Sequence, residues 1–184
     1  MTRLAILLSL AALLALAAPS IAQTTSPYAG QEQRSIKALS ESEIRDLMEA
    51  RGMGLAKAAE LNSYPGPLHV MELARQLDLS EAQRTATQSL YASMRDEAPS
   101  LGGRIVEAEW NLDQAFATGR IDPTDLRTRV NAIAALQGEL RVVHLNAHLV
   151  QLSLLTPEQV ARYNALRGYD ASVVSHGAHR HGGD

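Results

Sequence analysis

The sequence lacks cysteine and has few aromatic residues: one Trp, one Phe and five Tyr among 184 residues. It therefore contains no disulfide and no cysteine nucleophile. H-E-x-x-H, G-x-S-x-G and glycine-rich phosphate-loop motifs are absent as well, and the carboxylates of the predicted helices are expected to be solvated. These absences exclude the common metalloprotease, serine-hydrolase and nucleotide-binding patterns. We expect a protein that is not an enzyme.

The sequence also lacks a concentration of charge of one sign. Its formal net charge is −3, and the basic residues are scattered among acidic ones without a basic stripe. This distribution argues against nucleic acid as the main partner. Ala, Leu, Glu, Gln and Arg are abundant instead, and this composition favours helices.

The only long apolar run lies at the N-terminus. Arg3 precedes a nearly unbroken apolar stretch over residues 4–18, and the small residues Ser20 and Ala22 flank Ile21 before Gln23. This order predicts a signal peptide over residues 1–22 that is cleaved before Gln23. A retained membrane anchor is the alternative, but about 15 apolar residues fall short of the roughly 20 needed to span a bilayer. We expect an exported, periplasmic protein of about 160 residues without stable membrane insertion.

Two five-residue segments, LSEAQ at 79–83 and LTPEQ at 155–159, share the pattern Leu, Ser or Thr, two residues, then Gln. In such a capping box the hydroxyl accepts a hydrogen bond from the backbone N–H three residues later. The Gln side chain accepts one from the N–H of the cap residue. Each copy therefore predicts the start of a helix. The motif positions are Leu79, Ser80 and Gln83 in the first copy and Leu155, Thr156 and Gln159 in the second.

The remaining sequence predicts further helices and no strand. Residues 23–38 are polar and are expected to form a flexible leader. A third capping pattern at residues 39–44, with Glu43 in place of Gln, predicts a helix to about residue 61. A turn over residues 62–67 and a short helix over 68–77 should follow, the latter with Leu68, Met71, Leu73 and Ala74 on its apolar side. After Gly168 the tail, residues 170–184, is expected to be disordered.

Two long helices are predicted between the two motifs. The first carries an apolar stripe that keeps one phase across Pro99 and the Gly102–Gly103 pair, which favours one helix with a kink over two helices. Gly119 should end it, and Asp122 with Pro123 should begin the next, which runs to about residue 154. The stripe residues are Leu90, Met94, Ala98, Leu101, Ile105, Ala108, Leu112 and Phe116, then Leu126, Val130, Ile133, Leu136, Leu140, Val143 and Ala147.

These elements predict an all-α fold with four to five helices, in which a long helical hairpin is flanked by shorter helices. Two long helices with single apolar stripes enclose little core, so burial at roughly 25 cal/mol per Å² gives marginal stability. A homodimer would add burial. Alternatively, part of the apolar face remains exposed for a client protein.

Together, the predicted export signal, the absence of cysteine, the helical hairpin and the two motifs, 76 residues apart, resemble the LTXXQ-motif periplasmic family. This family comprises Spy/CpxP-type chaperones and the related zinc-resistance-associated and heavy-metal-sensor proteins. The resemblance covers residues 39–169 and implies a four-helix, cradle-like dimer. It also implies ATP-independent chaperone, stress-pathway inhibitor or metal-binding activity. Ser80 stands where the motif has Thr, and this exchange retains the hydroxyl.

The histidines are the candidate metal ligands. His144 and His148 are four residues apart and share one face of a predicted helix, a spacing that allows two imidazoles to chelate Zn, Cu or Ni. Alternatively, both rings meet only solvent or a carboxylate. His69, which follows Pro67 closely, is interpreted as structural. The tail is either a weak metal-binding tract or a solvated segment, and its histidines are His176, His179 and His181.

The leading functional hypothesis is a cofactor-free, homodimeric periplasmic chaperone that binds unfolded or misfolded envelope proteins. A metal sensor or metal-resistance protein of the same fold is the first alternative, and an inhibitory partner of a membrane sensor protein is the second. The scarcity of aromatic residues favours weak, adaptable contacts with clients. No sequence feature identifies the client-binding residues.

Overall fold

The computed structural model describes residues 25–169. The chain divides into two units, residues 1–32 and 33–184. In the first, the described residues form turns and the start of the 3-10 helix η1 (Gln31–Gln33). The description below concerns the second unit. The predicted signal peptide, residues 1–22, and the predicted tail, residues 170–184, lie outside the described residues.

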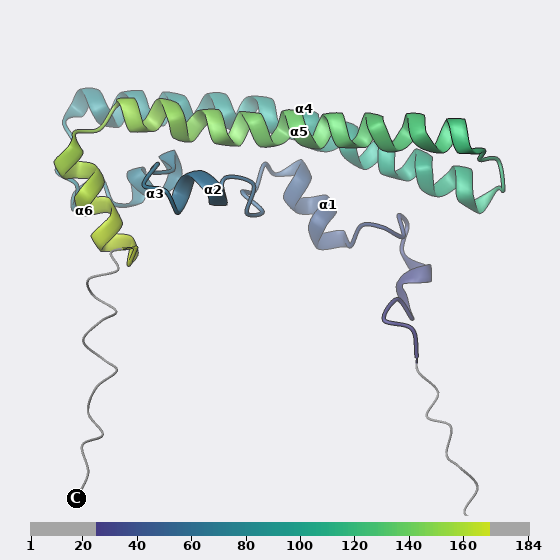
Figure 1. Cartoon of the computed structure of the whole chain (residues 1–184). Coiled ribbons are helices and arrows are strands. Elements are labelled where there is room, and N and C mark those ends of the chain that lie inside the picture. Colours follow the sequence, from purple (N-terminus) through teal and green to yellow (C-terminus); the bar gives the residue numbers. More distant parts are fainter. Residues whose placement is uncertain (1–24, 170–184) are drawn as a thin grey trace, which may run out of the picture. The chain divides into compact units, whose positions relative to one another are not determined.

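A hairpin of two long helices, α4 (Glu81–Ala117) and α5 (Pro123–Ser153), dominates the second unit (Figure 1). As predicted, Gly119 lies directly after α4, with a positive φ of 64° that suits glycine. Asp122 then caps α5 by accepting hydrogen bonds from the N–H groups of Thr124 and Asp125, while Pro123 occupies the first helical position. The connection is therefore short and built from capping residues.

The long helix α4 is continuous through Pro99, as the unbroken phase of its apolar stripe predicts. Close by, Gly102 is buried where the backbone of α1 (Glu41–Met48) crosses the hairpin. A Cβ atom at position 102 would lie only 2.0 Å from the carbonyl oxygen of Leu47. Glycine at this position therefore allows α1 to pack directly on the α4 backbone.

The third capping pattern predicted one helix to residue 61, and this predicted length is wrong. Its start is confirmed, because Ser40 and Glu43 form a capping box at α1. The chain then leaves the helix at Ala50, Met53 and Gly54, which all have positive φ, and re-enters it only at α2 (Lys57–Glu60). Positive φ is incompatible with a continuing α-helix, so one predicted helix becomes two.

The next predicted helix, over 68–77, is also shorter. It forms α3 (Pro67–Glu72), and the chain continues in turns to Asp78. Val70 is its fully buried apolar residue, whereas Leu68, which was predicted to face inward, is 41 % exposed. The prediction was wrong for Leu68, whereas Met71, Leu73 and Ala74 are partly buried, as expected.

Two apolar clusters pack the short helices, and a buried polar pair joins α4 to α5, in which Gln151 donates to Thr87 at 3.2 Å. The first cluster joins α1 to α4 and α5. The second joins α3 and the turn after it to α6 (Pro157–Arg167). Their buried members are Leu47, Ala50, Ala98, Leu101, Ile105, Leu136 and Leu140 in the first cluster, and Val70, Leu77, Leu79 and Tyr163 in the second.

The apolar stripe is not buried along its whole length. Phe116, which was predicted to face inward, is 58 % exposed. Leu126 and Val130, near the start of α5, are exposed as well. These residues flank the α4–α5 connection, beyond the part of the hairpin that the first cluster covers. The prediction was wrong here because periodicity gives the face of a helix but not where its covering partner ends.

The end of the predicted leader is held on the hairpin. Ile36 is buried, and Lys37 bonds to the carboxylate of Asp113 in α4 through its backbone N–H at 3.3 Å and its Nζ at 3.2 Å. The ordered part of this unit therefore begins before residue 39.

All regular structure in residues 25–169 is helical, which confirms the predicted all-α class. This part contains six α-helices, one more than the predicted maximum, because the first predicted helix divides in two. None of the helices described is sufficiently long and apolar to cross a bilayer.

Candidate functional site

The two LTXXQ segments form capping boxes at the starts of α4 and α6. Ser80 Oγ accepts from the N–H of Gln83 at 3.2 Å, and Thr156 Oγ1 accepts from the N–H of Gln159 at 3.3 Å. In return, each Gln Oε1 accepts from the N–H of its own cap residue at 3.0 Å. Each box thus satisfies two backbone donors that a helix start leaves free.

The two boxes also contact each other through their glutamines. Gln83 Nε2 donates to Gln159 Oε1 at 2.8 Å, and Gln159 Nε2 donates to Gln83 Oε1 at 3.1 Å. Each Nε2 donates a second bond to the chain just before the other box: Gln83 to the Leu154 carbonyl and Gln159 to the Leu77 carbonyl. We call this paired arrangement of Gln83 and Gln159 the glutamine clasp.

The clasp uses both the donors and the acceptor of each side-chain amide. Each oxygen accepts two bonds and each nitrogen donates two, so both amides are fully paired. A carboxylate in either position would keep the capping acceptor and lose both donors. The motif residues therefore have a structural role here, since they lock the start of α4 to the start of α6.

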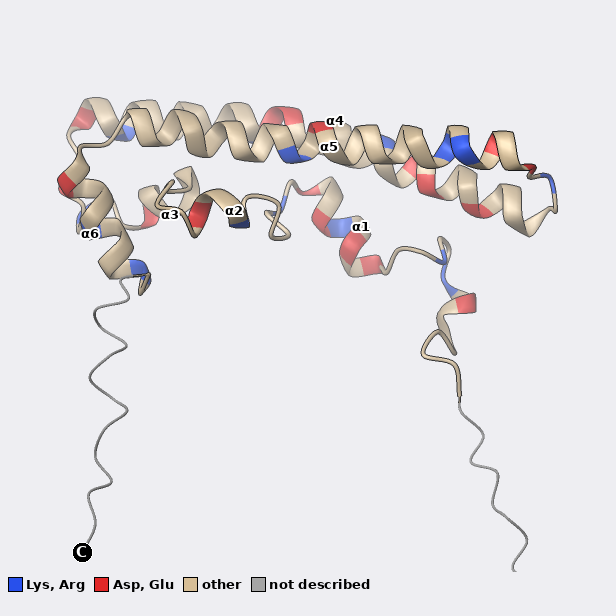
Figure 2. Cartoon of the chain, in the orientation of Figure 1, with Lys and Arg blue, Asp and Glu red and all other residues tan. Residues whose placement is uncertain are grey.

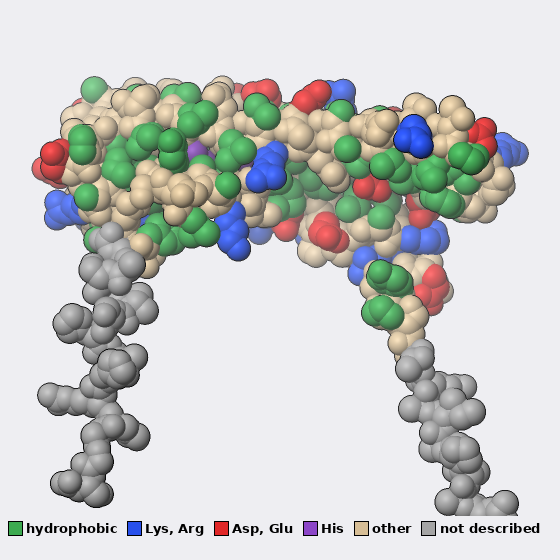
Figure 3. Space-filling view, in the orientation of Figure 1, with side chains coloured by type: hydrophobic (Ala, Val, Ile, Leu, Met, Phe, Trp, Pro, Cys, Tyr) green, Lys and Arg blue, Asp and Glu red, His purple; other side chains and the backbone are tan. Residues whose placement is uncertain are grey.

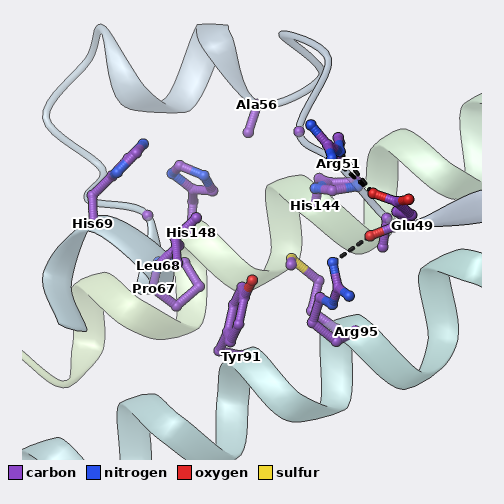
Figure 4. Close-up of a pocket in the computed structure, with 14 residues that line it drawn as sticks. Glu49, Arg51, Ala56, Pro67, Leu68, His69, Tyr91, Arg95, His144 and His148 are labelled. Atoms are coloured by element: carbon purple, nitrogen blue, oxygen red, sulfur yellow. Dashed lines mark hydrogen bonds and ion pairs between the residues drawn. The ribbon is translucent and has the colours of Figure 1, made fainter. Parts of the chain in front are cut away.

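His144 and His148 line one cavity of about 500 Å³, which we call the histidine cavity (Figure 4). Its floor is formed by α5 and α4, which contribute the histidines, Tyr91, Met94 and Arg95. Its other walls are the segment after α1, with Glu49 and Arg51, and the start of α3, with Pro67, Leu68 and His69. Residues from four separate segments therefore meet at this site.

The orientation of His148 is fixed by its backbone partner. Its Nδ1 lies 2.7 Å from the carbonyl oxygen of Tyr64, and because a carbonyl only accepts, Nδ1 must carry the proton. In the neutral ring the lone pair is then on Nε2. A Cβ at Gly66 would lie 2.9 Å from Cε1 and 3.1 Å from Nε2 of this ring, so glycine leaves room for the imidazole.

His144 is more deeply buried, with only 4 % of its surface exposed. Its Nε2 has no hydrogen-bond partner among the described residues. Burial lowers the pKa of His144 below its usual value, and the neighbouring His148 lowers it further. The folded protein therefore holds His144 as a neutral imidazole around pH 7.

The predicted metal ligands are only partly brought together. His144 and His148 share a cavity, but the described residues contain no group of three His, Asp or Glu side chains placed to hold a metal ion. His69 also lines the cavity, where its Nδ1 bonds to Glu72 at 2.9 Å. The tail histidines His176, His179 and His181 lie outside the described residues.

Glu60 joins several elements next to this cavity. Its Oε1 accepts from the hydroxyl groups of Tyr163 and Tyr169 and lies 3.5 Å from Arg167 Nε, while its Oε2 lies 3.7 Å from His148 Nδ1. Burial and the carboxylate raise the pKa of Tyr163. This carboxylate fixes α2 against α5 and α6. This role of Glu60 could not be predicted from local sequence, because its partners are at least 88 positions away.

A second surface feature is an open apolar groove between the segment after α1 and the hairpin. Two adjoining hollows of about 460 and 490 Å³ share Met53, Leu55 and Arg141. We call their combined surface the apolar groove. Leu39, Leu47, Ile105 and Leu140 line its deeper end, and Lys57, Ala58 and Leu61 line its outer end.

The surroundings of the groove are of mixed charge. Lys and Arg alternate with Asp and Glu along α1 and the hairpin (Figure 2). Hydrophobic side chains are spread over the face of the molecule in Figure 3, with basic groups between them. The groove therefore offers apolar contact next to charged groups of both signs, namely Glu43, Lys57 and Arg141.

A model of the LTXXQ motif family matches residues 66–167, more than half of the chain, and this range includes both capping boxes. The protein belongs to the LTXXQ motif family. The resemblance drawn from the motifs is thereby confirmed. No curated protein and no solved structure was found to match the chain.

For this LTXXQ family member, the sequence located the motif residues and the histidine pair but not the surfaces that they support. The apolar groove went unrecognised because it depends on the break after α1, where Met53 has a positive φ. Gly52 and Gly54 were the only available signal. Glycines at alternate positions within a predicted helix suggest an interruption.

Proposed function

We propose that this LTXXQ family member is an exported, periplasmic chaperone of the Spy/CpxP type that binds unfolded envelope proteins without ATP or any cofactor. In this proposal it is not an enzyme. The observation that carries the proposal is the apolar groove, where Met53 and Leu61 remain 41 % and 57 % exposed. Exposed apolar surface bordered by charged groups is typical of sites that bind other proteins.

The composition of the groove suits weak binding of varied chains. Methionine and leucine adapt their shape to different apolar side chains, and Lys57 and Arg141 attract acidic segments. The first cluster holds the deeper end of the groove on the hairpin, because Leu47, Ile105 and Leu140 belong to both. Clients would therefore meet a surface that exists before they bind.

Aggregation of an unfolded client, measured by light scattering with and without the mature protein, tests this proposal. The double variant Met53→Ser, Leu61→Ser should lose most of the protection, since both side chains are exposed and contribute little to folding. Leu166→Ser in α6 is the matched control, because Leu166 is also exposed, at 45 %. If the wild-type protein leaves aggregation unchanged, the chaperone proposal is wrong.

A second candidate is a metal sensor or metal-resistance protein of the same fold. It is favoured by the histidine cavity, where His148 Nδ1 is bonded and leaves Nε2 for a ligand, and where His144 Nε2 has no partner within residues 25–169. Bound metal would compete with protons for the imidazole nitrogens, so affinity should weaken as the pH falls. Two nitrogens leave a zinc ion incomplete, and water, a carboxylate, the tail or a second subunit would supply the rest.

Isothermal titration with Zn²⁺, Cu²⁺ and Ni²⁺ tests this candidate. The metal lies in the cavity if binding is lost in the double variant His144→Ala, His148→Ala and survives removal of the chain from Ser175 onward. The metal is bound by the tail if binding is lost only when the tail is removed. No heat at micromolar affinity would exclude the metal candidate. Repeating the aggregation assay with these ions then separates a chaperone from a sensor.

An inhibitory partner of a membrane sensor protein is the third possibility implied by the family. The same surfaces would serve it, and a sensor domain would replace the unfolded client. A competition assay tests whether a folded sensor domain displaces an unfolded client from the groove, with the Met53→Ser, Leu61→Ser variant as control. Displacement would favour the inhibitory partner over the chaperone.

A further inference from the structure

Two guanidinium groups and one carboxylate line the histidine cavity. The carboxylate is that of Glu49, and Arg51 binds it at 2.9 Å and also binds Asp46, beside the cavity, at 3.4 Å. Arg95, from α4, donates through Nη1 to the backbone carbonyl of Glu49 (Figure 4). Because a carbonyl is neutral, this bond does not pair the charge of Arg95, an exposed side chain that forms no ion pair with the described residues. The guanidinium has further N–H donors, and the hydroxyl of Tyr91 points into the same space.

Apolar side chains also line the cavity. Pro67 and Leu68 come from the start of α3 and Met94 comes from α4, and Leu68 is 41 % exposed although its helix is packed on the hairpin. At about 500 Å³ the cavity falls within the range of ligand-binding pockets. A ligand with both a carboxylate and a compact apolar group would match this combination of lining residues.

The histidine side of the cavity adds an acceptor. Since His148 Nδ1 donates to the Tyr64 carbonyl, its Nε2 is available to accept a hydrogen bond from a ligand N–H. A carboxylate next to an apolar side chain and a backbone N–H is the chemistry of the C-terminal residue of a polypeptide. A free fatty acid has the first two groups and lacks the N–H donor.

We infer that the histidine cavity binds the C-terminal residue of an extended polypeptide. The carboxylate bonds to Arg95 and Tyr91, the side chain packs on Leu68 and Met94, and the amide N–H donates to His148. This inference rests on the proposed client-binding function and adds a second contact to it. The apolar groove would bind the body of a client, while the cavity would recognise a free chain end.

The test is fluorescence anisotropy with a labelled hexapeptide ending in leucine, prepared with either a free carboxylate or a C-terminal amide. The acid should bind the wild-type protein about tenfold more tightly than the amide, the factor expected for one charge-assisted hydrogen bond. Arg95→Gln should abolish this preference. Arg104→Gln is the matched control, because Arg104 lies on the same helix but does not line the cavity. Its Nη1 lies 3.8 Å from Glu139 Oε2.

Because Arg95 also holds the segment after α1, a second variant keeps the test independent of folding. Tyr91→Phe removes only a hydroxyl group and should reduce the preference for the acid while leaving thermal stability unchanged. Any of three results would overturn the inference. They are equal affinity for acid and amide, a preference for the acid that survives Arg95→Gln, and no binding of the acid up to about 1 mM, which corresponds to a free energy of about −4 kcal/mol.

The two proposals fail separately. The Met53→Ser, Leu61→Ser variant should lose protection of unfolded clients and retain the preference for the acid peptide. Protection of clients by a wild-type protein that does not distinguish acid from amide would overturn the inference and leave the chaperone proposal intact. Absence of protection together with acid-selective binding would contradict the chaperone proposal alone.

Discussion

At the scale of single residues, the two glutamines of the motif cap a helix and also join the two capping boxes to each other. A capping box needs only an acceptor at its fourth position, so Glu serves equally well, as Glu43 does at α1. Gln83 and Gln159 must also donate, both to each other and to backbone carbonyls. The amide is therefore required by the contact between the two boxes.

Gln159→Glu tests this requirement. The variant keeps its capping acceptor, loses the donors to Gln83 and to the Leu77 carbonyl, and places a carboxylate against the Gln83 oxygen. Unfolding by urea should show a loss of about 1–3 kcal/mol in the free energy of unfolding, the cost of leaving partly buried acceptors unpaired. Gln88→Glu, at an exposed position of α4, is the control. Equal stability of the two variants would show that the clasp contributes nothing.

His144 supports a second prediction at this scale, on pH dependence. Its pKa is lowered in the folded protein by burial and by His148, so the unfolded chain binds the proton more readily. Stability is therefore complete above the unfolded pKa of about 6.5 and falls as the pH drops below it. The charged or titratable groups that face this cavity are Glu49, Arg51, His69, Tyr91, Arg95 and His148.

Thermal melts between pH 7.5 and pH 5, values that bracket a histidine pKa of about 6.5, check this prediction. His144→Phe should flatten the decline in melting temperature, because phenylalanine has a similar shape and does not titrate. His69→Phe is the control on the same cavity. If wild type and His144→Phe decline in parallel, another group is responsible for any acid sensitivity.

At the scale of secondary-structure elements, the packing of α1 on α4 depends on one glycine. Gly102→Ala would bring a Cβ within 2.0 Å of the Leu47 carbonyl, so α1 must shift. We expect a loss of about 1–3 kcal/mol, the usual cost of overpacking. Gly103→Ala provides a matched control, because its Cβ would meet only Met48 Sδ at 3.7 Å. Alanine favours helix there by up to about 1 kcal/mol.

Chemical denaturation of both variants gives the comparison. Gly102→Ala should be less stable than wild type and Gly103→Ala equal or more stable. A Gly102→Ala protein as stable as its Gly103→Ala counterpart would show that α1 is not held close to α4 in solution.

The elements also show how far sequence reasoning reaches. Local signals placed the starts of α1, α4, α5 and α6, since capping residues act within four positions of themselves. The break after α1 was missed because Ala50 and Met53 adopt positive φ, a conformation that neither side chain favours and that tertiary packing must impose. The i, i+4 spacing placed His144 and His148 on one face. It did not reveal the cavity, which needs α3 and the segment after α1.

At the scale of the whole molecule, the hairpin has more apolar surface than its short helices cover. Trp110, Phe116, Leu126 and Val130 are 48 %, 58 %, 37 % and 45 % exposed around the α4–α5 connection. Hydrophobic side chains are visible at this end in Figure 3. Burial of several such residues stabilises by roughly 25 cal/mol per Å². A second copy of the chain would gain this free energy.

We therefore predict a homodimer that uses this end of the hairpin. Its melting temperature should rise with protein concentration, because association removes folded monomer from the unfolding equilibrium. Replacing Phe116 and Leu126 by Gln should abolish this dependence and give a monomer mass by light scattering. Leu149→Gln, also at an exposed apolar position of α5, is the control and should remain dimeric. A wild-type melt that is independent of concentration, with a monomer mass, would contradict the dimer, and a single chain would then present both the groove and the cavity.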